Sequence, residues 1–332
     1  MNWSEVDWSA LERLRELFLR GGPAAGPYWN SPGDLASYDF TYAVRIGWKW
    51  DQVLRELRLR GWRPASRTVL DWACGSGIAA RRVISFFGAE NFDSLTVWDH
   101  SPLACDFAVE AAQREFPALA VAQATPGLLA STEPLGLLVI SHVVNELTSD
   151  QLASLIALID RAEAVLWVEP GTHGASRELS AIRDDLRDEF HVIAPCTHEH
   201  SCPIERPGNE RHWCHFFAPP PGEIFADPNW VKFGQRAGID LRSLPYSFLA
   251  LDRRTAKSLD GLSRIIGRPE HFKPYARVLN CDATGLAELE VPKRVDPALV
   301  KELERTKAPL LYRWQRADNK ILGGELISAR EA

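Results

Sequence analysis

A short stretch of the chain, 194–216, carries side chains of the types that bind metals. APCTHEHSCPIERPGNERHWCHF holds three cysteines and four histidines and has no periodic apolar pattern. A segment this polar cannot fold around a core of its own, so it is either a disordered loop or is ordered by something other than apolar burial. Thiolates and imidazoles are soft metal ligands, which favours a metal site. The alternative is a loop that contains its three cysteines by chance.

A second set of residues is typical of a nucleoside site. In VLDWACGSGIAAR, Asp71 closes a predicted strand, and Gly75 and Gly77 allow a tight turn before a helix that begins near Ile78. The glycine spacing does not fit the dinucleotide pattern G-x-G-x-x-G. Asp99 ends the next predicted strand, where a carboxylate can accept hydrogen bonds from both ribose hydroxyls. Together these residues favour a nucleoside cofactor over a merely structural turn.

The glycine segment resembles the first motif of S-adenosylmethionine-dependent methyltransferases, with Ala73 where that motif usually has its first glycine. In such enzymes the target usually enters after the fourth strand, and here the chain reads VISHVVNEL, which supplies Ser141, His142, Asn145 and Glu146. His142 could act as a base or simply be hydrogen-bonded at the strand end. The Asn/Asp-Pro-Pro-aromatic signature and a Pro-Cys nucleophile are both missing there. The catalytic residues therefore stay open, with His142, Asn145 and Glu146 as candidates.

The elements that position these residues alternate along the chain. RTVLDWA, SLTVWDH, ALAVAQA, LGLLVISH and EAVLWVEPG look like buried strands, and helix-like segments separate them. This alternation predicts a doubly wound α/β sheet, which binds ligands at the carboxyl ends of its strands. We predict an N-terminal helical region over 1–62, a methyltransferase-like domain over 63–252 with a cysteine loop at 194–217, and a small C-terminal β module over 253–332.

Composition limits the class of protein. The chain has 332 residues, 45% of them hydrophobic, and no apolar run long enough to span a bilayer, so we expect no membrane partner. Its N-terminal residues resemble neither a signal peptide nor a transit peptide, which predicts a cytoplasmic protein. A formal net charge of −6 gives no global basic surface, and we expect no DNA partner.

Basic residues nevertheless gather in two places. The first is the predicted helix that runs from Tyr38 to about Leu59, and it includes Arg45, Lys49, Arg55, Arg58 and Arg60, with Arg63 and Arg67 beyond it. The second is the C-terminal module, where arginines and lysines alternate with aromatic residues on short predicted strands. Each could be a solvated face, and each could contact RNA phosphates, the second with base stacking as well.

The order of the motifs VLDWACGSG, SHVVNEL, VEPGT-x-G, APC-x-H-x3-CP and WCHF resembles the methyltransferase-like small-ribosomal-subunit assembly factors, known from mitochondria and with bacterial relatives. The resemblance covers about Tyr38 to Cys281. It implies a Rossmann-like class I methyltransferase sheet, an S-adenosylmethionine site and binding to small-subunit ribosomal RNA in the assembling subunit. It also implies a four-iron four-sulfur (4Fe-4S) cluster held by four cysteines, which match Cys196, Cys202, Cys214 and Cys281.

Zinc remains the alternative for the cysteine site, with imidazoles from His198, His200, His212 or His215 completing a tetrahedral set. Two functions also remain open. The first is a non-catalytic assembly factor that binds ribosomal RNA, which the missing signatures after the fourth strand favour. The second is an active rRNA methyltransferase. A zinc-binding small-molecule methyltransferase explains neither the cluster loop nor the basic segments.

Overall fold

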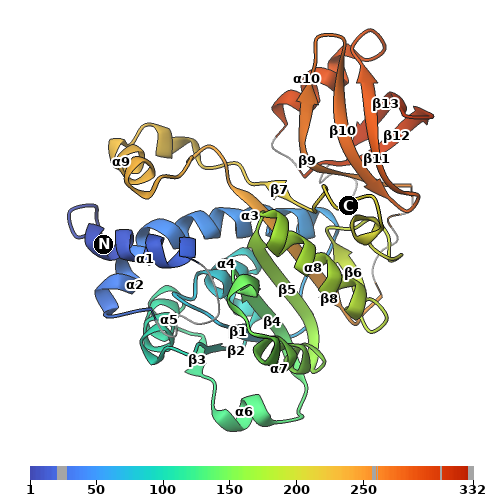
Figure 1. The fold of residues 1–332 in the computed structure, drawn as a ribbon. Helices are drawn as coiled ribbons and strands as arrows, with labels where there is room; N and C mark the ends of the chain where they lie inside the picture. Colours follow the sequence, from blue (N-terminus) through green and yellow to red (C-terminus); the bar gives the residue numbers. More distant parts are fainter. Residues whose placement is uncertain (21–27, 256–258, 260, 307–308, 328–332) are drawn as a thin grey trace. The chain divides into compact units, whose positions relative to one another are not determined.

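The computed structural model describes residues 1–20, 28–255, 259, 261–306 and 309–327 (Figure 1). The chain divides into two compact units, each assembled from separate stretches. Unit 1 comprises Met1–Leu54, Arg63–Val168 and Pro219–Leu244, and unit 2 comprises Arg55–Trp62, Glu169–Ala218 and Pro245–Ala332. None of the described helices is both long and apolar enough to cross a membrane.

Unit 1 is built around a parallel sheet with the strand order β3-β2-β1-β4-β5. The strands are β1 (Thr68–Trp72), β2 (Ser94–Trp98), β3 (Ala120–Gln123), β4 (Leu135–Ser141) and β5 (Ala162–Pro170), whose last two residues belong to unit 2. The central strand β1 pairs with both β2 and β4, so the chain switches direction across the sheet at this strand. This order confirms the predicted doubly wound, Rossmann-like methyltransferase-type sheet.

Helices connect these strands as the alternating pattern predicts. They are α4 (Ile78–Phe87), α5 (Pro102–Glu115), α6 (Pro126–Ala130) and α7 (Ser149–Ile159), with short 3-10 turns η2 (Ala89–Asn91) and η3 (Val144–Glu146). α4 packs against β1 and β4, and α5 packs against β2 and β3. Unit 1 also contains η5 (Gly222–Phe225) and α9 (Pro228–Ala237).

The N-terminal segment adds α1 (Trp8–Arg20), α2 (Pro32–Tyr38), a π-helical turn η1 (Asp39–Ala43) and α3 (Val44–Leu59). The predicted helix from Tyr38 to Leu59 corresponds to η1 and α3. Leu14, Trp29 and Leu35 form an apolar cluster with Ala104 of α5. Burial against α5 therefore holds the N-terminal helices near the sheet.

In unit 2, the first strands pair in the antiparallel direction. β8 (Pro245–Asp252) pairs with β6 (His191–Ala194) and with β7 (Phe216–Phe217). α8 (His173–Leu186) packs against β8, and its side chains Leu179, Ile182 and Leu186 are all buried. A 3-10 turn, η4 (Pro203–Glu205), lies within the cysteine loop.

The C-terminal part of unit 2 is a closed barrel, drawn in orange and red in Figure 1. Its elements are β9 (Ser263–His271), β10 (Tyr275–Asp282), β11 (Gly285–Pro292), α10 (Pro297–Arg305), β12 (Leu311–Ala317) and β13 (Lys320–Leu326). The strands close in the order β10-β11-β13-β12-β9 around a core that includes Val278, Val291 and Ile321. The predicted small β module is thus confirmed, and its helix and its closure into a barrel are findings of the structure.

Candidate functional site

Asp71 lies at the carboxyl end of β1 and is 1% exposed. Its Oδ2 accepts a hydrogen bond from the backbone N–H of Ala80, 3.3 Å away, at the start of α4. Its Oδ1 has no hydrogen-bond partner among the residues that the structure describes. Burial raises the pKa of this carboxyl to about 8, so a cationic ligand nearby would favour its ionised form. A buried acceptor without a donor also suits a ligand that supplies one.

The loop after β1 passes through left-handed backbone conformations. Ala73, Gly75 and Gly77 have φ values of +57°, +51° and +74°. At Gly75, no described atom lies within 4 Å of the position that a Cβ would take, so the backbone there is open to a ligand. At Gly77, a Cβ would stand 3.0 Å from the Cβ of Ala108, so glycine lets α4 begin against α5. Ala73 adopts a conformation that glycine reaches more easily.

Asp99 follows β2 and reaches the glycine loop. Its carboxylate accepts hydrogen bonds from the N–H of Gly75 at 3.0 Å and of Ser101 at 2.9 Å. The side chain is 7% exposed, and burial raises the pKa of its carboxyl. The structure therefore brings Asp71, Gly75 and Asp99 together at the carboxyl ends of two neighbouring strands, where a doubly wound sheet binds its ligands.

Ser141 and His142, at the end of β4, are both engaged by α3. Ser141 Oγ accepts a hydrogen bond from Trp50 Nε1 at 3.0 Å and lies 3.2 Å from His142 Nδ1. His142 Nε2 lies 3.0 Å from Lys49 Nζ. Burial lowers the pKa of His142, and the charge of Lys49 lowers it further. An ammonium only donates, so the neutral ring accepts at Nε2 and carries its proton on Nδ1.

This arrangement affects the catalytic candidates differently. The Nε2 lone pair of His142 is occupied by Lys49, so the ring is not a free base. Asn145 is exposed on η3. Glu146 is half-buried, and burial, followed by the charge of Asp99, raises the pKa of its carboxyl to about 7. Of the three candidates, Glu146 is thus the one that exchanges a proton near neutral pH.

Two tyrosines that sequence reasoning missed stand near these carboxylates. Burial raises the pKa of both Tyr28 and Tyr38, and the charges of Glu146 and Asp99 raise each of them further. The signal in the sequence was the aromatic pair YW inside a Gly/Pro-rich stretch that otherwise reads as a loop.

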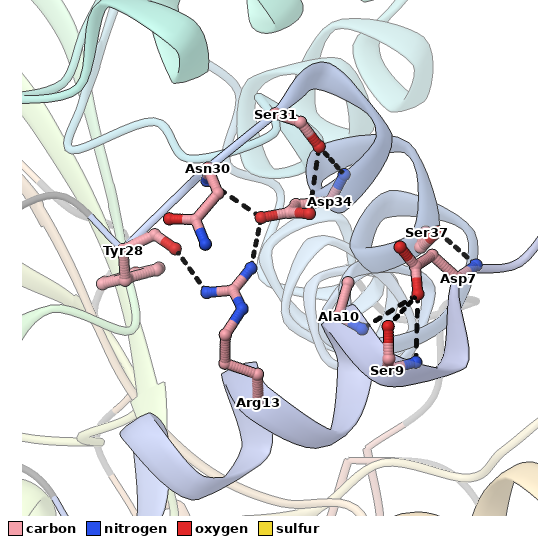
Figure 2. Close-up of polar contacts among 9 residues, drawn as sticks. All are labelled: Asp7, Ser9, Ala10, Arg13, Tyr28, Asn30, Ser31, Asp34 and Ser37. Atoms are coloured by element: carbon pink, nitrogen blue, oxygen red, sulfur yellow. Dashed lines mark hydrogen bonds and ion pairs between the residues drawn. The ribbon is translucent and has the colours of Figure 1, made fainter.

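A polar network holds the segment that carries Tyr28 (Figure 2). Arg13 of α1 donates to the carbonyl oxygen of Tyr28 at 2.9 Å and forms an ion pair with Asp34. The buried carboxylate of Asp34 also accepts from the N–H of Asn30 at 2.9 Å and from the Ser31 hydroxyl at 3.0 Å. Charge-assisted hydrogen bonds of this kind fix geometry, so the position of Tyr28 depends on Arg13 and Asp34.

The four cysteines singled out by the family resemblance all lie in unit 2. Cys196 follows β6, Cys202 precedes η4, Cys214 precedes β7, and Cys281 lies on β10 of the barrel. Cys202, Cys214 and Cys281 belong to one cluster with aliphatic side chains. The other two cysteines of the chain lie in unit 1.

The thiols lie close enough to influence one another's ionisation. Burial raises the pKa of Cys214 and of Cys281, and the charges of Cys196 and Cys202 raise both further. Burial, followed by the charge of Cys196, raises the pKa of Cys202 to about 12. The structure thus brings Cys202, Cys214 and Cys281 into one cluster, and the charge of Cys196 acts on all three.

Polar contacts from α8 order the cysteine loop, which has no core of its own. Arg183, 2% exposed, donates to the carbonyl oxygens of His200 at 2.6 Å and His198 at 3.0 Å. The neighbouring Asp184 accepts from the N–H of Cys202 at 2.9 Å. These bonds satisfy backbone groups that a loop cannot pair within itself.

Two further arginines hold the same loop. Arg177 of α8 donates to the carbonyl oxygens of Ile204, Asn209 and His212 at 3.0, 3.3 and 3.1 Å. Arg60 donates to those of Ile193, Pro195 and Cys196 at 2.9, 2.7 and 2.8 Å. The prediction that Arg60 lies on a solvated or phosphate-contacting face is wrong, because Arg60 is 7% exposed and directed to the loop. The spacing of charged residues in the sequence shows on which side of a helix they lie. It does not show which distant segment of the chain packs against that side.

Among the histidines of the zinc alternative, His198 comes within reach of a cysteine. Its Nε2 is 3.8 Å from Cys281 Sγ, and its buried Nδ1 has no partner among the described residues. His212 Nε2 accepts a hydrogen bond from Arg211, and His215 Nδ1 lies 3.0 Å from a backbone oxygen. Within the described ranges, no three His, Cys, Asp or Glu side chains are grouped as they are around a single metal ion.

A model of a known protein family matches this chain. The model of the family described as mitochondrial small ribosomal subunit Rsm22 matches residues 45–290, which is most of the chain. This range includes the glycine loop, the end of β4 and all four clustered cysteines. Curated protein sequences give no match.

Solved structures that are similar include methyltransferases. Magnesium protoporphyrin IX methyltransferase from Synechocystis PCC 6803 with bound SAM is 14% identical, with 68% of this chain and 85% of that chain covered and a TM-score of 0.39. A putative RNA methyltransferase from Pyrococcus horikoshii is 9% identical, with 61% and 84% covered and a TM-score of 0.38. The 16S rRNA methylase RmtB is 18% identical, with 56% and 69% covered and a TM-score of 0.35. Likenesses at these TM-scores are too low to carry a functional inference.

Replacing Asp71 by asparagine should flatten the dependence of stability on pH. The pKa of this carboxyl is about 8 in the folded chain, against an ordinary value of 3.8. The folded state therefore keeps a proton that the unfolded chain releases, and the free energy of unfolding falls as pH rises from about 4 to about 8. One such proton gives a slope of about 1.4 kcal/mol per pH unit. Urea unfolding of both proteins at a series of pH values measures the difference in slope.

Asp93→Asn is the matched control. Asp93 pairs with Arg67 at the surface, and this contact lowers the pKa of its carboxyl, so it titrates below that pH range. Its removal should leave the slope unchanged. Equal slopes for the wild-type protein and Asp71→Asn would mean that Asp71 is ionised in the folded chain at neutral pH.

Proposed function

The chain belongs to the family of the mitochondrial small ribosomal subunit protein Rsm22, and on this premise we propose that it is an rRNA-binding assembly factor of the small ribosomal subunit. The observation that carries the proposal is the family match over residues 45–290. In this role the chain binds S-adenosylmethionine at the carboxyl ends of β1, β2 and β4, and it binds an iron–sulfur cluster through four cysteines.

The carboxylates of unit 1 support S-adenosylmethionine as the ligand. Asp99 would accept hydrogen bonds from the ribose hydroxyls, and the open backbone at Gly75 allows close approach of the ligand. Asp71 precedes this loop on β1, and its unpartnered Oδ1 and raised pKa suit a ligand that brings positive charge. Ala73, Gly77 and Ser141 complete the proposed site. When bound, S-adenosylmethionine supplies a sulfonium-activated methyl group.

The residues after β4 favour a binding role over methyl transfer. Lys49 occupies the Nε2 of His142, and the sequence signatures of amino-group and 5-methylcytosine methyltransferases are missing at this position. Glu146 supports the second candidate, an active rRNA methyltransferase, because its carboxyl has a pKa of about 7 and can hold or release a proton there. Transfer of a labelled methyl group from S-adenosylmethionine to small-subunit particles would favour this candidate.

The donor set in unit 2 fits a cluster held by cysteine thiolates. Cys202, Cys214 and Cys281 share an apolar surrounding, and Cys196 influences the ionisation of all three. Zinc with His198 as one ligand is the alternative.

Crosslinking the full chain to RNA in cells, followed by sequencing of the contacted nucleotides, tests the proposed function. We expect enrichment of small-subunit ribosomal RNA over large-subunit ribosomal RNA. The same crosslinked material, sorted by particle density, should sediment with incomplete small subunits. Equal recovery of both ribosomal RNAs would contradict the proposal.

Asp99→Ala should weaken the binding of S-adenosylmethionine by about 1–3 kcal/mol, because hydrogen bonds to a charged acceptor are lost. Calorimetric titration of the purified chain measures the change. Asp106→Ala, which removes an exposed carboxylate from α5, serves as the control and should bind normally. Unchanged affinity in Asp99→Ala would show that the nucleoside binds elsewhere.

Cys281→Ser should abolish cluster binding. The wild-type chain, purified without oxygen, should contain about four iron atoms. The variant should lose them, and the 194–217 loop and β10 should become sensitive to protease, because a ligand that joins distant segments constrains both. Iron analysis and limited proteolysis of one preparation measure both effects.

Cys105→Ser is the control for this experiment, since Cys105 lies on α5 in unit 1 and should leave the iron content unchanged. S-adenosylmethionine binding should survive in part in Cys281→Ser. Stoichiometric zinc without iron after iron-replete anaerobic expression would exclude the cluster, and full iron in Cys281→Ser would exclude Cys281 as a ligand.

A further inference from the structure

The C-terminal barrel has the strand arrangement of an OB-fold. Its first strand, β9, pairs with β10 and with β12, which closes the barrel. The third strand, β11, pairs in parallel with the fifth, β13, at Glu290 and Lys320. The single helix of the barrel, α10, connects β11 to β12. Barrels of this type bind oligonucleotides or oligosaccharides with the face of their second and third strands and the adjoining loops.

A fold alone assigns no ligand, and the side chains at the end of the barrel determine what can bind there. The turn between β9 and β10, residues 272–274, presents an aromatic pair. Phe272 is 43% exposed, and its ring stacks on that of Tyr275 with 4.8 Å between centroids and 28° between planes. Phe272 does not belong to the apolar cluster that fills the barrel. An exposed stacked pair offers a flat face to an unpaired base.

Positive charge surrounds this pair. Lys273 lies in the turn itself, and Lys293 and Arg294 lie in the loop after β11. The N–H of Lys293 donates to the carbonyl oxygen of Pro274 at 2.9 Å, which joins the two loops. The guanidinium of Arg277 lies 5.2 Å from the ring centroid of Phe272. Four cationic side chains therefore lie near the aromatic pair, in the same turn, on β10 or on the adjoining loop.

Two acidic side chains near this patch are already engaged. Glu270 forms an ion pair with Arg277, and Asp296 accepts a hydrogen bond from the N–H of Leu299 as the cap of α10. Lys273, Lys293 and Arg294, all exposed, form no ion pair with any residue that the structure describes. These three charges are thus available to a polyanion.

We propose that this patch, Phe272, Lys273, Tyr275, Arg277, Lys293 and Arg294, is a docking surface for single-stranded RNA. The proposal deepens the proposed function, on which it rests, by assigning the RNA contact to one end of the barrel. Base stacking on Phe272 and Tyr275 requires unpaired bases, and the three free cations neutralise phosphates on either side. Duplex RNA keeps its bases stacked inside the helix and would use the cations alone.

Fluorescence anisotropy with the full chain tests this surface, with a labelled single-stranded RNA of about twelve nucleotides and a hairpin of the same composition as probes. Phe272→Ala should weaken binding to the single strand by about tenfold and binding to the hairpin little. Leu322→Ala is the matched control, since Leu322 is an apolar side chain of β13 that is 48% exposed and lies outside the patch. It should bind both probes as the wild-type chain does.

The salt dependence gives an independent readout. Lys273→Gln combined with Lys293→Gln removes two phosphate contacts, so the slope of log affinity against log salt should decrease by about 1.4 for a single strand. Lys301→Gln combined with Arg305→Gln removes the same charge from exposed positions of α10 and should leave this slope unchanged. Equal slopes for the two double variants would overturn the proposal.

The outcomes separate the two proposals. If the wild-type chain neither binds RNA nor crosslinks to small-subunit ribosomal RNA, the proposed function fails. If it does both and the patch variants match their controls, the docking surface alone is overturned. Patch variants that keep RNA affinity but lose association with ribosomal proteins would show a protein interface and would also overturn it.

Discussion

One buried carboxylate links the parts of unit 2 to one another. Glu56 is fully buried and forms ion pairs with Arg60 on its own helix and with Arg264 on β9 of the barrel. Arg60 in turn donates to the carbonyl oxygens of Ile193, Pro195 and Cys196, where the cysteine loop leaves β6. Removing one member of a buried ionic group leaves its partners uncompensated, at a cost of about 3–5 kcal/mol. The barrel and the loop therefore share one electrostatic support.

In unit 1, the positions of the site residues depend on the backbone conformation of the turns that follow β1 and β4. Ala73 after β1 and His142 after β4 both have φ of +57°, a conformation that costs energy in residues with a Cβ. Backbone hydrogen bonds to neighbouring strands hold each turn, from Cys74 N–H to Trp98 O at 2.9 Å and from His142 N–H to Val168 O at 2.8 Å. The sheet thus fixes the turns that present Asp71 and Ser141.

The sequence predicts those features that depend on local pattern. Continuous apolar runs mark β1, β4 and β5 because both faces of a parallel sheet are buried. It does not predict the inward direction of Arg60, because its carbonyl partners come more than a hundred residues later. Nor does it predict that the barrel closes, since the parallel pairing of β11 with β13 is a tertiary contact between strands that are not neighbours in the sequence. Tyr28 was missed because aromatic residues in a loop carry no periodicity.

In the cysteine loop, the same arginine that holds the backbone also affects the ionisation of the thiols. Burial lowers the pKa of Arg183, yet the charge of Cys196 and the contact with Asp184 more than offset this, so the pKa is raised overall. Four thiolates around the proposed cluster would bring negative charge into a buried position, and buried charge requires a partner. The guanidinium that holds the carbonyls of His198 and His200 is therefore also placed to stabilise ionised cysteines. A change that displaces Arg183 would disturb the backbone of the loop and the ionisation of its thiols together, so neither can be altered independently of the other.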